Sequence, residues 1–531
     1  MALTTILIGL VVVTFVLRRV MESLRHAKNA RELGCKPPPL APIKDPLGIL
    51  SLLEMIQADK EKRVPALTEQ RVNKMRDDNG GNYVTTMRLR TGAVENILTI
   101  DPKNIQAILA TQFKEFCVGA QRETCMGPLL GAGIFTTDGP AWSHSRAMLR
   151  PQFTRDQISD LSLEEVHVQN AFKAMPPVNN QGWTTVDIQT IFFRLTLDSA
   201  TELLFGESCK SQLVALGSAS SDTELSARGT DFGANFDRGQ WYLSQRVRTP
   251  LLKFLYNGDE FKSCCKEVHR FVDQCVERAL GETGSKKTKQ QLDADGKPLE
   301  GEHYVFLHAM AAETQDPIEL RAQLLNVLLA GRDTTASLLS WTVMLLARHP
   351  DKFRRLRRDI VETFGDYASP RNLTFANLKA CTYLQRVMTE VLRLFPPLPM
   401  NARYATCDTS LPRGGGPDAE SPVYVKKGQA VLYNAHILHR RTDIWGPDAG
   451  EFNPDRWEGR KGGWDYLPFN GGPRICIGQQ FALTEAGYVL ARLLQRFDGL
   501  EELNPSSKVS WGLTLVSQPG ESVKVRLHEA V

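Results

Sequence analysis

The chain has 531 residues, of which 42% are hydrophobic and 23% are charged, and its formal net charge is +4. This composition is typical of a globular protein and excludes a disordered chain and a strongly basic nucleic-acid binder. The ten cysteines include no C-x-x-C pair, which is typical of a protein from a reducing compartment rather than a small secreted disulfide scaffold. We therefore expect one large domain that binds no nucleic acid.

The first segment of the chain is apolar. Residues 2–17, ALTTILIGLVVVTFVL, carry no charge and are followed at once by Arg18 and Arg19. This pattern predicts a transmembrane anchor over residues 1–21. A helix lying in the membrane interface is the alternative, although the segment has no polar face. The positive-inside rule then predicts a single-pass protein of the endoplasmic reticulum membrane whose remaining chain faces the cytosol.

Residues 22–45 are basic and then rich in proline, with three consecutive prolines at 37–39. They predict a semi-rigid linker between the membrane and a domain over residues 46–531. Strand-like alternation occurs between about 80 and 100 and again at 421–433, whereas nearly everything else has helical spacing. The fold class predicted is mainly α with a small β portion. Two polar stretches, 217–235 and 281–302, are interpreted as solvated loops.

Trp142 and Arg146 form the first candidate motif, W-x-x-x-R, within GPAWSHSRAMLRPQF. Four residues apart, they share one helix face and can reach the same partner. This motif is weak when it stands alone.

A helical pattern from about 318 to 348 contains Ala330-Gly331-Arg332-Asp333-Thr334-Thr335 at its centre. Glycine costs about 1 kcal/mol in a helix interior, so its presence needs a reason. Thr334 can donate a hydrogen bond to the carbonyl oxygen of Ala330, opening a local bulge with room for a small molecule. A packing glycine beside a helix-bending threonine is the structural alternative.

Glu390 and Arg393 lie three residues apart in TEVLRLFPPLP, so they share a helix face and can pair. A surface salt bridge is the usual meaning of this spacing. Here the flanking residues are apolar, which favours a buried pair that needs a third partner.

The stretch FNGGPRICIG, residues 469–478, places Cys476 where a glycine-rich loop meets a helical pattern. A helix N-terminus lowers the pKa of a thiol and favours a metal ligand or a nucleophile. Zinc would need further ligands nearby, and a cysteine protease would need an oxyanion site, so a thiolate ligand to haem iron is the remaining functional interpretation. A glycine turn with a structural cysteine is the alternative, and it would be favoured if this loop stood alone. Gly471, Gly472 and Gly478 would let the backbone approach the macrocycle, while Arg474 would pair with a propionate.

The motif F-x-x-G-x-R-x-C-x-G resembles the haem-binding signature of the cytochrome P450 family, and the other motifs follow in that family's order over residues 46–520. The resemblance implies a cytochrome P450 fold with haem b and dioxygen. It implies that Asp333 and Thr334 deliver protons, and that Arg456 joins Glu390 and Arg393 in a structural triad. The haem contacts that it implies are Cys476 as the metal ligand, Phe469, Gly472, Arg474, Gly478, Trp142, Arg146, Arg403 and His439.

The family reaction inserts one oxygen atom into an organic substrate and needs two electrons. No G-x-G-x-x-G follows a strand, and Gly131-Ala132-Gly133 lacks the third glycine. We therefore expect a separate NADPH-cytochrome P450 reductase in the membrane, docking near Arg460, Lys461 and Arg474.

Several stretches, including LPRGGGPDAESPVYVKKGQ, resemble the fungal branch that hydroxylates long-chain n-alkanes and fatty acids. This resemblance implies an apolar, chain-shaped substrate that arrives from the membrane. Ala402 is smaller than the aromatic residue expected there, so a fungal secondary-metabolite oxygenase acting on a polyketide or terpenoid is the alternative. The pocket residues implied by position are Phe116, Leu129, Phe135, Leu325, Leu329, Met400, Ala402 and Leu513.

Two other classes of haem protein are open at this point. A haem-thiolate isomerase or dehydratase usually departs from the oxygen groove, whereas Asp333 and Thr334 are both present. A haem-based gas sensor is the alternative without catalysis, and reductant-dependent oxygen consumption would exclude it.

Overall fold

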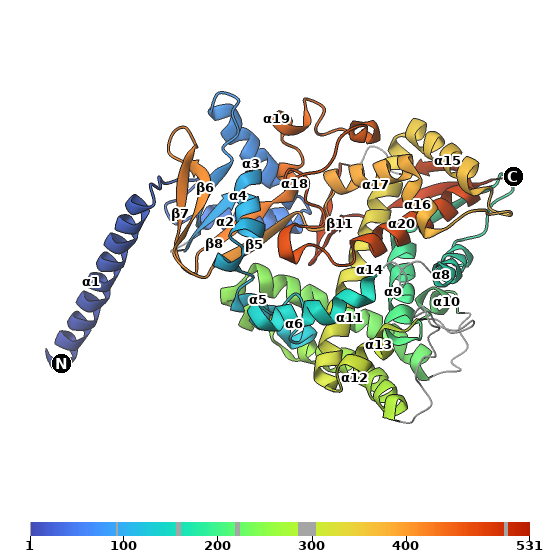
Figure 1. Ribbon diagram of the computed structural model, residues 1–531, viewed down its shortest axis with the longest axis horizontal. Helices are drawn as coiled ribbons and strands as arrows, with labels where there is room; N and C mark the ends of the chain where they lie inside the picture. The colour runs from blue at the N-terminus through green and yellow to red at the C-terminus, as the bar shows by residue number, and fades with distance from the viewer. Residues whose placement is uncertain are drawn as a thin grey trace.

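The computed structural model describes residues 2–91, 94–154, 161–217, 224–284, 304–503 and 508–530. A region of sheet and short helices, built from residues 49–117 and 400–445, lies beside a larger helical region (Figure 1). The first helix projects away from both.

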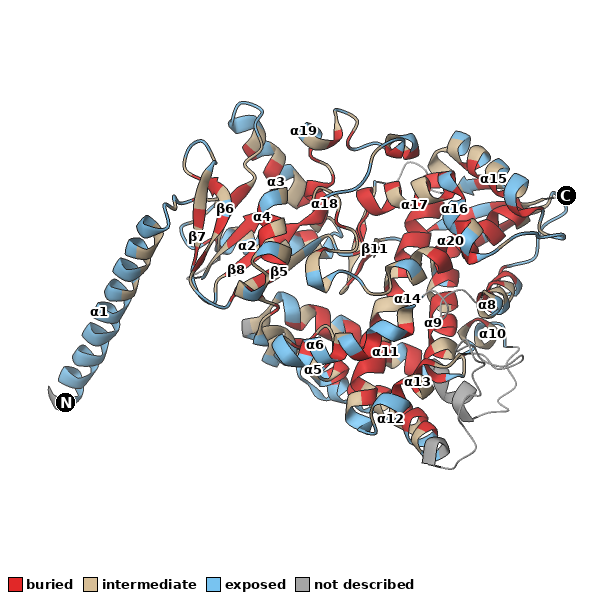
Figure 2. Ribbon diagram, in the orientation of Figure 1, coloured by how far each residue is buried: buried red, intermediate tan, exposed pale blue. Residues whose placement is uncertain are grey.

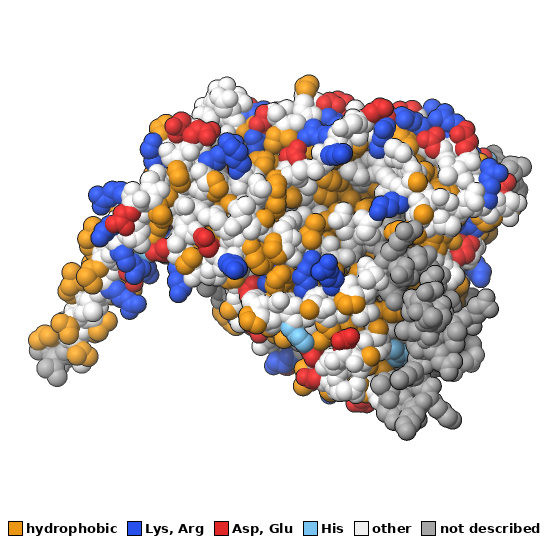
Figure 3. Space-filling model, viewed as in Figure 1, with side chains coloured by type: hydrophobic (Ala, Val, Ile, Leu, Met, Phe, Trp, Pro, Cys, Tyr) orange, Lys and Arg blue, Asp and Glu red, His pale blue; other side chains and the backbone are white. Residues whose placement is uncertain are grey.

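Helix α1 (Ala2–Glu32) is continuous and 31 residues long. Its segment Thr4–Glu32 is long and apolar enough to cross a membrane, and no part of its most apolar stretch is buried. Hydrophobic side chains cover its free end and basic side chains gather nearer the body (Figure 3). These features agree with the predicted anchor.

The linker differs from the prediction, because its first part continues helix α1 and its prolines pack onto the sheet. The Lys36 amide donates to the Pro422 carbonyl at 2.9 Å, and Pro39 accepts from the Arg88 amide at 2.8 Å. Ala41 donates to the Arg88 carbonyl at 2.9 Å. The proline segment therefore lies along a sheet edge and is not a free spacer, because backbone groups that pair with a strand lose their mobility.

The sheet region contains the two predicted β stretches. Strand β2 pairs antiparallel with β1 and parallel with β8, and the largest sheet among the described residues has the order β1-β2-β8-β5-β3. Its strands and the adjoining hairpin are β1 (Thr86–Thr91), β2 (Val94–Thr99), β3 (Phe116–Cys117), β5 (Met400–Ala405), β6 (Thr409–Gly415), β7 (Ser421–Val425) and β8 (Ala430–Asn434). Short helices around it are α2 (Ile49–Lys60), α3 (Val64–Asp78), α4 (Pro102–Gln106), η1 (Ala107–Thr111), η2 (Phe113–Glu115), α18 (Ala435–Leu438) and α19 (Thr442–Trp445).

The helical region holds most of the buried residues (Figure 2). Its helices are α5 (Ala120–Leu130), α6 (Gly139–Leu149), η3 (Arg150–Phe153), α8 (Ser162–Lys173), α9 (Ile188–Phe205), α10 (Ser211–Ala215), α11 (Glu224–Arg248), η4 (Pro250–Tyr256), α12 (Asp259–Gly284), α13 (Phe306–Glu313), α14 (Pro317–Arg348), α15 (Pro350–Phe364), α16 (Phe375–Ala380), α17 (Thr382–Leu394), η5 (Pro454–Trp457), η6 (Gly472–Arg474) and α20 (Gln479–Arg496). Smaller strands are β4 (Trp183–Asp187), β9 (Phe497–Glu502), β10 (Trp511–Leu513), β11 (Ser517–Pro519) and β12 (Lys524–Glu529).

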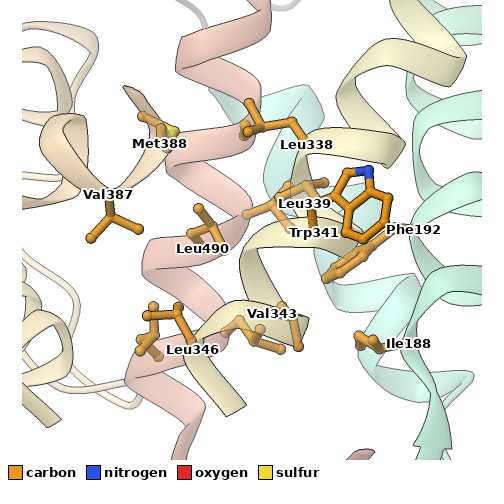
Figure 4. Packing of buried hydrophobic residues seen from close by; sticks show 14 of the residues in the cluster. Ile188, Phe192, Leu338, Leu339, Trp341, Val343, Leu346, Val387, Met388 and Leu490 are labelled. Carbon is orange, nitrogen blue, oxygen red and sulfur yellow. The ribbon is translucent and has the colours of Figure 1, made fainter. Parts of the chain in front are cut away.

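Helix α14 runs through the centre of the molecule and agrees with the helix predicted at 318–348. The Asp316 side chain caps its start by accepting from the amides of Ile318 and Glu319, and Pro317 occupies the first turn. Its C-terminal half packs against α9, α17 and α20, with Leu339 and Trp341 between them (Figure 4). Trp341 is fully buried and stacks on Phe395 at 4.1 Å between ring centroids. A fully buried aromatic ring of this kind stabilises the fold by about 2 kcal/mol or more.

The prediction of a solvated loop at 217–235 is wrong from residue 224 onward, because helix α11 begins there. Phe232 and Phe236 are buried on this helix, and Phe232 stacks on Phe271 of α12. Polar neighbours in the sequence concealed an apolar face of α11 that packs against α12 and α5. The second predicted loop, 281–302, lies outside the described residues after Gly284.

Candidate active site

Cys476 lies between the short helix η6 and helix α20, as the sequence predicted. The Cys476 amide donates a hydrogen bond of 2.9 Å to the Phe469 carbonyl oxygen. This bond closes the loop that begins at Phe469 and ends at Cys476. The side chain is exposed, yet desolvation by the surrounding protein raises the pKa of its thiol, with the Gly478 amide and Arg146 opposing the rise. The thiol therefore keeps accessible surface although the surrounding protein desolvates it.

The direction of this shift differs from the sequence prediction of a lowered pKa. Desolvation exceeds the stabilisation that the start of α20 provides, because a thiolate loses more by leaving water than one amide returns. A cation bound at the sulfur atom reverses this balance, since metal coordination deprotonates a thiol outright.

An accessible stripe interrupts the buried surface of α14. Leu328, Leu329, Arg332 and Asp333 are buried, whereas Val327, Ala330, Gly331 and Thr334 keep accessible surface. The four accessible positions are spaced by three and four residues and so share one helix face. A Cβ atom at Gly331 would meet nothing within 4 Å, which indicates open space beside the helix at this point.

Thr334 on this stripe donates its hydroxyl proton to the Ala330 carbonyl at 2.7 Å, as predicted. The predicted bulge is absent, because α14 stays α-helical through these residues. The space arises because Gly331 has no side chain, and it needs no opening of the helix.

Asp333 is buried on the neighbouring face of α14. Its Oδ1 has no hydrogen-bond partner within the described part of the chain and lies 3.7 Å from Nη1 of Arg332. Burial raises the pKa of Asp333 to about 6, while Arg332 opposes the rise and Asp237 adds to it. Arg332 also donates to Oδ2 of Asp237 on α11 at 3.1 Å, and Asp237 reaches solvent. A buried carboxyl group with this pKa can donate a proton near neutral pH.

Three arginines and one carboxylate meet near Cys476. Arg474 donates to Oδ1 of Asp138 at 2.7 Å, and its guanidinium lies 4.4 Å from the Trp142 ring centroid. Arg122 donates to Oδ1 of Asn401 at 2.8 Å, and Arg403 is buried nearby. The pKa of Arg474 is lowered to about 10, and burial is the largest cause. The charge of Asp138 opposes this shift, whereas the charges of Arg403 and Arg122 add to it. The cluster carries more positive than negative charge and therefore suits a bound dianion.

Arg122 is a candidate that the sequence analysis missed. Burial lowers the pKa of its guanidinium to about 10, and Arg403 contributes to the shift. No family motif includes it, and only the approach of α5 to β5 places it beside Arg403.

Arg146 lies beside the cysteine loop. Its Nη1 donates to the Ile475 carbonyl at 3.0 Å, and its guanidinium lies 5.9 Å from the Trp142 ring centroid. Trp142 therefore has Arg146 and Arg474 on its ring, so α6 joins the cysteine loop.

Gly472 is required by the fold of the loop itself. Its φ is +67°, and a Cβ atom there would lie 1.9 Å from the Leu109 carbonyl oxygen. The contact with η1 and the left-handed conformation both demand a glycine at this position. Gly478 sits more freely, since its Cβ would lie 3.5 Å from Phe153.

The prediction that His439 contacts a propionate is wrong. His439 is fully buried, its Nε2 accepts from the Leu467 amide at 2.8 Å, and its Nδ1 lies 3.1 Å from the Arg393 carbonyl. Burial lowers the pKa of His439 to about 3, so the ring is neutral. Both ring nitrogens are hydrogen-bonded to backbone groups, so neither is available to a ligand.

The structure brings Glu390, Arg393 and Arg456 together. Arg393 makes two hydrogen bonds of 2.8 Å to the Glu390 carboxylate, and both side chains are fully buried. Arg456 Nε lies 3.4 Å from Glu390 Oε1, and the Trp457 indole donates to Oε2 at 2.9 Å. Arg393 also donates to the carbonyls of His439, Ala449 and Glu451. Each charged group of the cluster has hydrogen-bond partners. These bonds connect α17 to the segment before the cysteine loop.

The predicted pocket residues divide by accessibility. A side chain that lines a cavity keeps some accessible surface, so a side chain with no accessible surface does not line one. Leu129 and Leu325 have no exposed area and belong to the core between α5, α12 and α14, which contradicts the prediction for both. Phe116 and Leu329 are almost wholly buried. Accessible surface remains at Phe135, Met400, Ala402 and Leu513.

Arg474 does not suit the predicted reductase surface, because it is buried and paired with Asp138. Arg460 is bound to Asp465 at 2.7 Å and lies over the Trp445 ring. Lys461 is exposed.

These residues fit haem b. Cys476 offers an accessible thiol, Gly331 leaves open space beside α14, and the cluster of Arg122, Arg403 and Arg474 suits two carboxylates. Cys476 would hold the iron, while Arg122, Arg403 and Arg474 would face the propionates.

Comparisons with known proteins agree with this site. A family model described as cytochrome P450 matches residues 63–524. Cytochrome P450 monooxygenase g430 of Fusarium sp is 50% identical over 522 residues, which are 97% of this chain and 89% of that protein. Cytochrome P450 52A10 of Candida maltosa is 48% identical over 433 residues, covering 80% of this chain and 79% of the other.

A solved structure shows the same fold. The crystal structure of cytochrome P450DA heme domain aligns with a TM-score of 0.73 at 22% identity, covering 94% of this chain and 98% of that one. At this identity the likeness concerns the fold alone.

Proposed function

The chain belongs to the cytochrome P450 family of monooxygenases, and we propose that it is a membrane-anchored enzyme that hydroxylates long-chain fatty acids or n-alkanes. The observation that carries the proposal is the accessible, desolvated thiol of Cys476 together with the accessible stripe of α14. Haem held by a thiolate activates dioxygen, so that one oxygen atom enters the substrate and the other becomes water.

The chain's own residues have separate tasks in this proposal. Thr334 keeps its hydroxyl oriented by donating to Ala330, so its oxygen can accept a hydrogen bond from a donor in the open space beside Gly331. Asp333, with its pKa near 6, supplies the acidic proton close by. Arg122, Arg403 and Arg474 bind and orient the cofactor through its carboxylates.

An apolar substrate is supported by exposed apolar residues on α2 and η4. Leu50 and Leu53 of α2 and Phe254 and Leu255 of η4 are each at least half exposed. Arg248, two residues before η4, binds Asp59 of α2 at 2.7 Å, so these apolar residues belong to adjoining segments. Together with α1 they favour a membrane surface as the source of substrate, and a membrane-bound NADPH-cytochrome P450 reductase as the electron donor.

The proposal is tested with the full chain expressed in microsomes. Reduced protein with carbon monoxide should show the red-shifted Soret band of thiolate ligation, and Cys476→Ser should remove it. Fatty acids and alkanes should shift the haem spectrum from low to high spin, and added reductase should give hydroxylated products. Normal thiolate spectra with no product from any chain-shaped substrate would refute the substrate class.

A second candidate substrate class, polyketides or terpenoids, is favoured by Ala402. This small residue on β5 keeps accessible surface, so the space beside it is wider than an aromatic side chain would allow. Ala402→Phe should narrow that space, and it should abolish turnover of a bulky substrate while sparing a linear one.

A further inference from the structure

Helix α1 is joined to the body by side chains as well as by the chain itself. It meets the body at the β6–β7 hairpin (Figure 1). His26 Nδ1 lies 2.9 Å from the Tyr424 hydroxyl oxygen on β7, and Asn29 donates to Oδ2 of Asp408 at 3.1 Å. His26 and Asn29 are three residues apart and therefore share one face of α1. We call these four side chains the anchor clamp.

The anchor clamp is a partly enclosed contact. The side chains of His26 and Asp408 are only 17% and 26% exposed. The second oxygen of Asp408 accepts from the Lys427 amide at 2.9 Å, so the clamp also holds the turn that joins β7 to β8. Directed hydrogen bonds between half-buried groups fix the angle between α1 and the hairpin, because each bond weakens steeply when its geometry changes.

The chain beyond the clamp leaves α1 no flexible hinge. The Cys35 amide donates to the Ala30 carbonyl at 2.8 Å, and the Lys36 amide donates to the Pro422 carbonyl at 2.9 Å. A Cβ atom at Gly415 of β6 would overlap the Lys36 carbonyl oxygen, which shows how closely the segment lies on the hairpin. Backbone pairing therefore continues from the end of α1 to the sheet.

The order of these contacts shows which end of the hairpin faces the membrane. The clamp contacts β7 at Tyr424, whereas Lys36, further along the chain, contacts it at Pro422. Since the apolar part of α1 precedes both contacts, the Tyr424 end of β7 is the end nearer to the membrane. Lys426 and Lys427 follow at that end and are exposed.

The clamp stands close to the membrane surface. The uncharged segment ends at Leu17, and α1 stays helical beyond it. At a rise of about 1.5 Å per residue, His26 lies about 12 Å along the helix from Arg18. The headgroup layer is roughly 5–8 Å deep on each side of the hydrocarbon. Charges act over about 8–10 Å more at physiological salt, so the turn after β7 lies within reach of charged headgroups.

The surface at this level is basic. Arg25 is exposed on α1 beside His26, and Lys426 and Lys427 are exposed in the adjoining turn. The acids on this half of α1 are paired with bases of the same helix, namely Glu22 with Arg18 at 3.2 Å and Glu32 with Lys28 at 3.8 Å. Asp408 is held within the clamp. The exposed charge that remains is positive and suits an anionic lipid surface.

We propose that the anchor clamp makes α1 and the catalytic domain one rigid body, and that it holds Arg25, Lys426 and Lys427 against the anionic headgroups of the leaflet nearer the domain. The inference rests on the proposed function in one respect, because it takes α1 as the membrane anchor. A fixed anchor keeps the same face of the domain toward the membrane, from which an apolar substrate arrives.

The first test measures rigidity and needs neither substrate nor reductase. In the full chain in phosphatidylcholine vesicles, hydrogen exchange at the Lys36 amide should be as slow as in the sheet. Asn29→Ala combined with Tyr424→Phe should speed that exchange about tenfold, because the clamp then loses its bonds. Glu22→Gln, which breaks an ion pair within α1, is the matched control and should change nothing. Exchange at the rate of an unstructured peptide in the unchanged protein would overturn the proposal.

The second test measures the lipid contact. Cys407 is exposed and directly precedes Asp408, so a fluorescent thiol label there reports on this end of the hairpin, with single labelling checked by mass spectrometry. Lipids with a spin-labelled headgroup should quench the label, and phosphatidylserine should increase the quenching. Lys426→Gln with Lys427→Gln should reduce the quenching in anionic vesicles about twofold. Salt at about 1 M should do the same, because the Debye length falls to about 3 Å.

A matched pair of lysines serves as the control for charge. Lys379 of α16 and Lys524 of β12 are exposed, and α16 lies far from α1 in Figure 1. Lys379→Gln with Lys524→Gln should leave the quenching unchanged. Quenching that is absent, or that does not respond to phosphatidylserine and to the change at Lys426 and Lys427, would overturn the proposed lipid contact.

The outcomes separate this inference from the proposed function. Normal hydroxylation by a protein whose Lys36 amide exchanges freely refutes the rigid anchor alone. Slow exchange and lipid-dependent quenching in a protein that hydroxylates no chain-shaped substrate refute the substrate class alone. A full chain that does not enter vesicles refutes the membrane anchor, and this inference with it.

Discussion

Two polar regions deep in the molecule differ in how their charges are met. Behind the cysteine loop, Glu390 and Arg393 are fully buried and each has several partners, including Arg456 and Trp457. In the middle of α14, Asp333 is equally buried but one of its oxygens has no hydrogen-bond partner among the described residues.

The difference separates structural from chemical roles. A buried charge with matched partners stays ionised and holds elements together, whereas a buried acid without enough partners shifts its pKa toward neutrality. The predictions below change one region at a time.

The largest effect is expected at the matched region. Arg393→Leu leaves the Glu390 charge buried and three carbonyls unpaired, so the free energy of unfolding should fall by about 3–5 kcal/mol. Denaturant unfolding measures the loss. Arg278→Leu, which removes an exposed pair with Glu207, should cost less than about 1 kcal/mol. Equal losses of unfolding free energy in Arg393→Leu and Arg278→Leu would contradict the difference between the buried cluster and an exposed ion pair.

The unmatched region should respond in activity rather than in stability. Asp333→Asn keeps the shape but removes the acidic proton, so product formation should fall by about a hundredfold or more, with an unfolding free energy within about 1 kcal/mol of the original. Asp273→Asn is the matched control, because Asp273 of α12 binds Arg321 of α14 at 2.7 Å and so also pairs with an arginine of the helix that carries Asp333. Hydroxylation at the original rate in Asp333→Asn would assign Asp333 to the structural class.

The pH dependence should identify Asp333. With its pKa near 6, the protonated fraction falls about fivefold between pH 6 and pH 7, so a step that needs this proton should slow by that factor. The native pKa lies above the ordinary value of 3.8, so the native state binds more protons, and stability from this group declines as pH rises between the two values. Asp333→Asn should flatten both profiles, measured by product assay and by unfolding. A rate that rises toward pH 7 would contradict the assignment.

The smallest effect on stability is expected at Gly331, and Gly472 provides the contrast. Gly331→Ala should stabilise α14 by about 0.5–1 kcal/mol, because the new methyl group meets open space, while it reduces turnover by filling that space. Gly472→Ala should destabilise the cysteine loop, because its Cβ would overlap the Leu109 carbonyl. Thermal unfolding and product assays on both variants compare the sites. If Gly331→Ala were less stable than the unchanged protein, the space beside Gly331 on α14 would be occupied rather than open.

Local patterns predicted the elements that local chemistry decides. The Thr334 hydrogen bond, the Glu390–Arg393 pair and the place of Cys476 before α20 each depend on residues a few positions apart. Spacing of three or four on one helix fixes such pairs whatever surrounds them. The errors occurred where a distant segment decided the outcome, as for Leu129, whose side chain is enclosed by α11 and α12.

The amino-acid sequence by itself determined the family, the helix that carries Thr334, the cysteine loop and the apolar first segment, because each is written in short-range spacing and composition. Only the tertiary structure decided that His439 turns both nitrogens to the backbone and that the proline segment pairs with the sheet. It also decided that His26 and Asn29 of α1 meet Tyr424 and Asp408 at the β6–β7 hairpin. Burial and partner geometry depend on segments hundreds of residues apart, and those determine which charges are neutralised and which remain free to move protons.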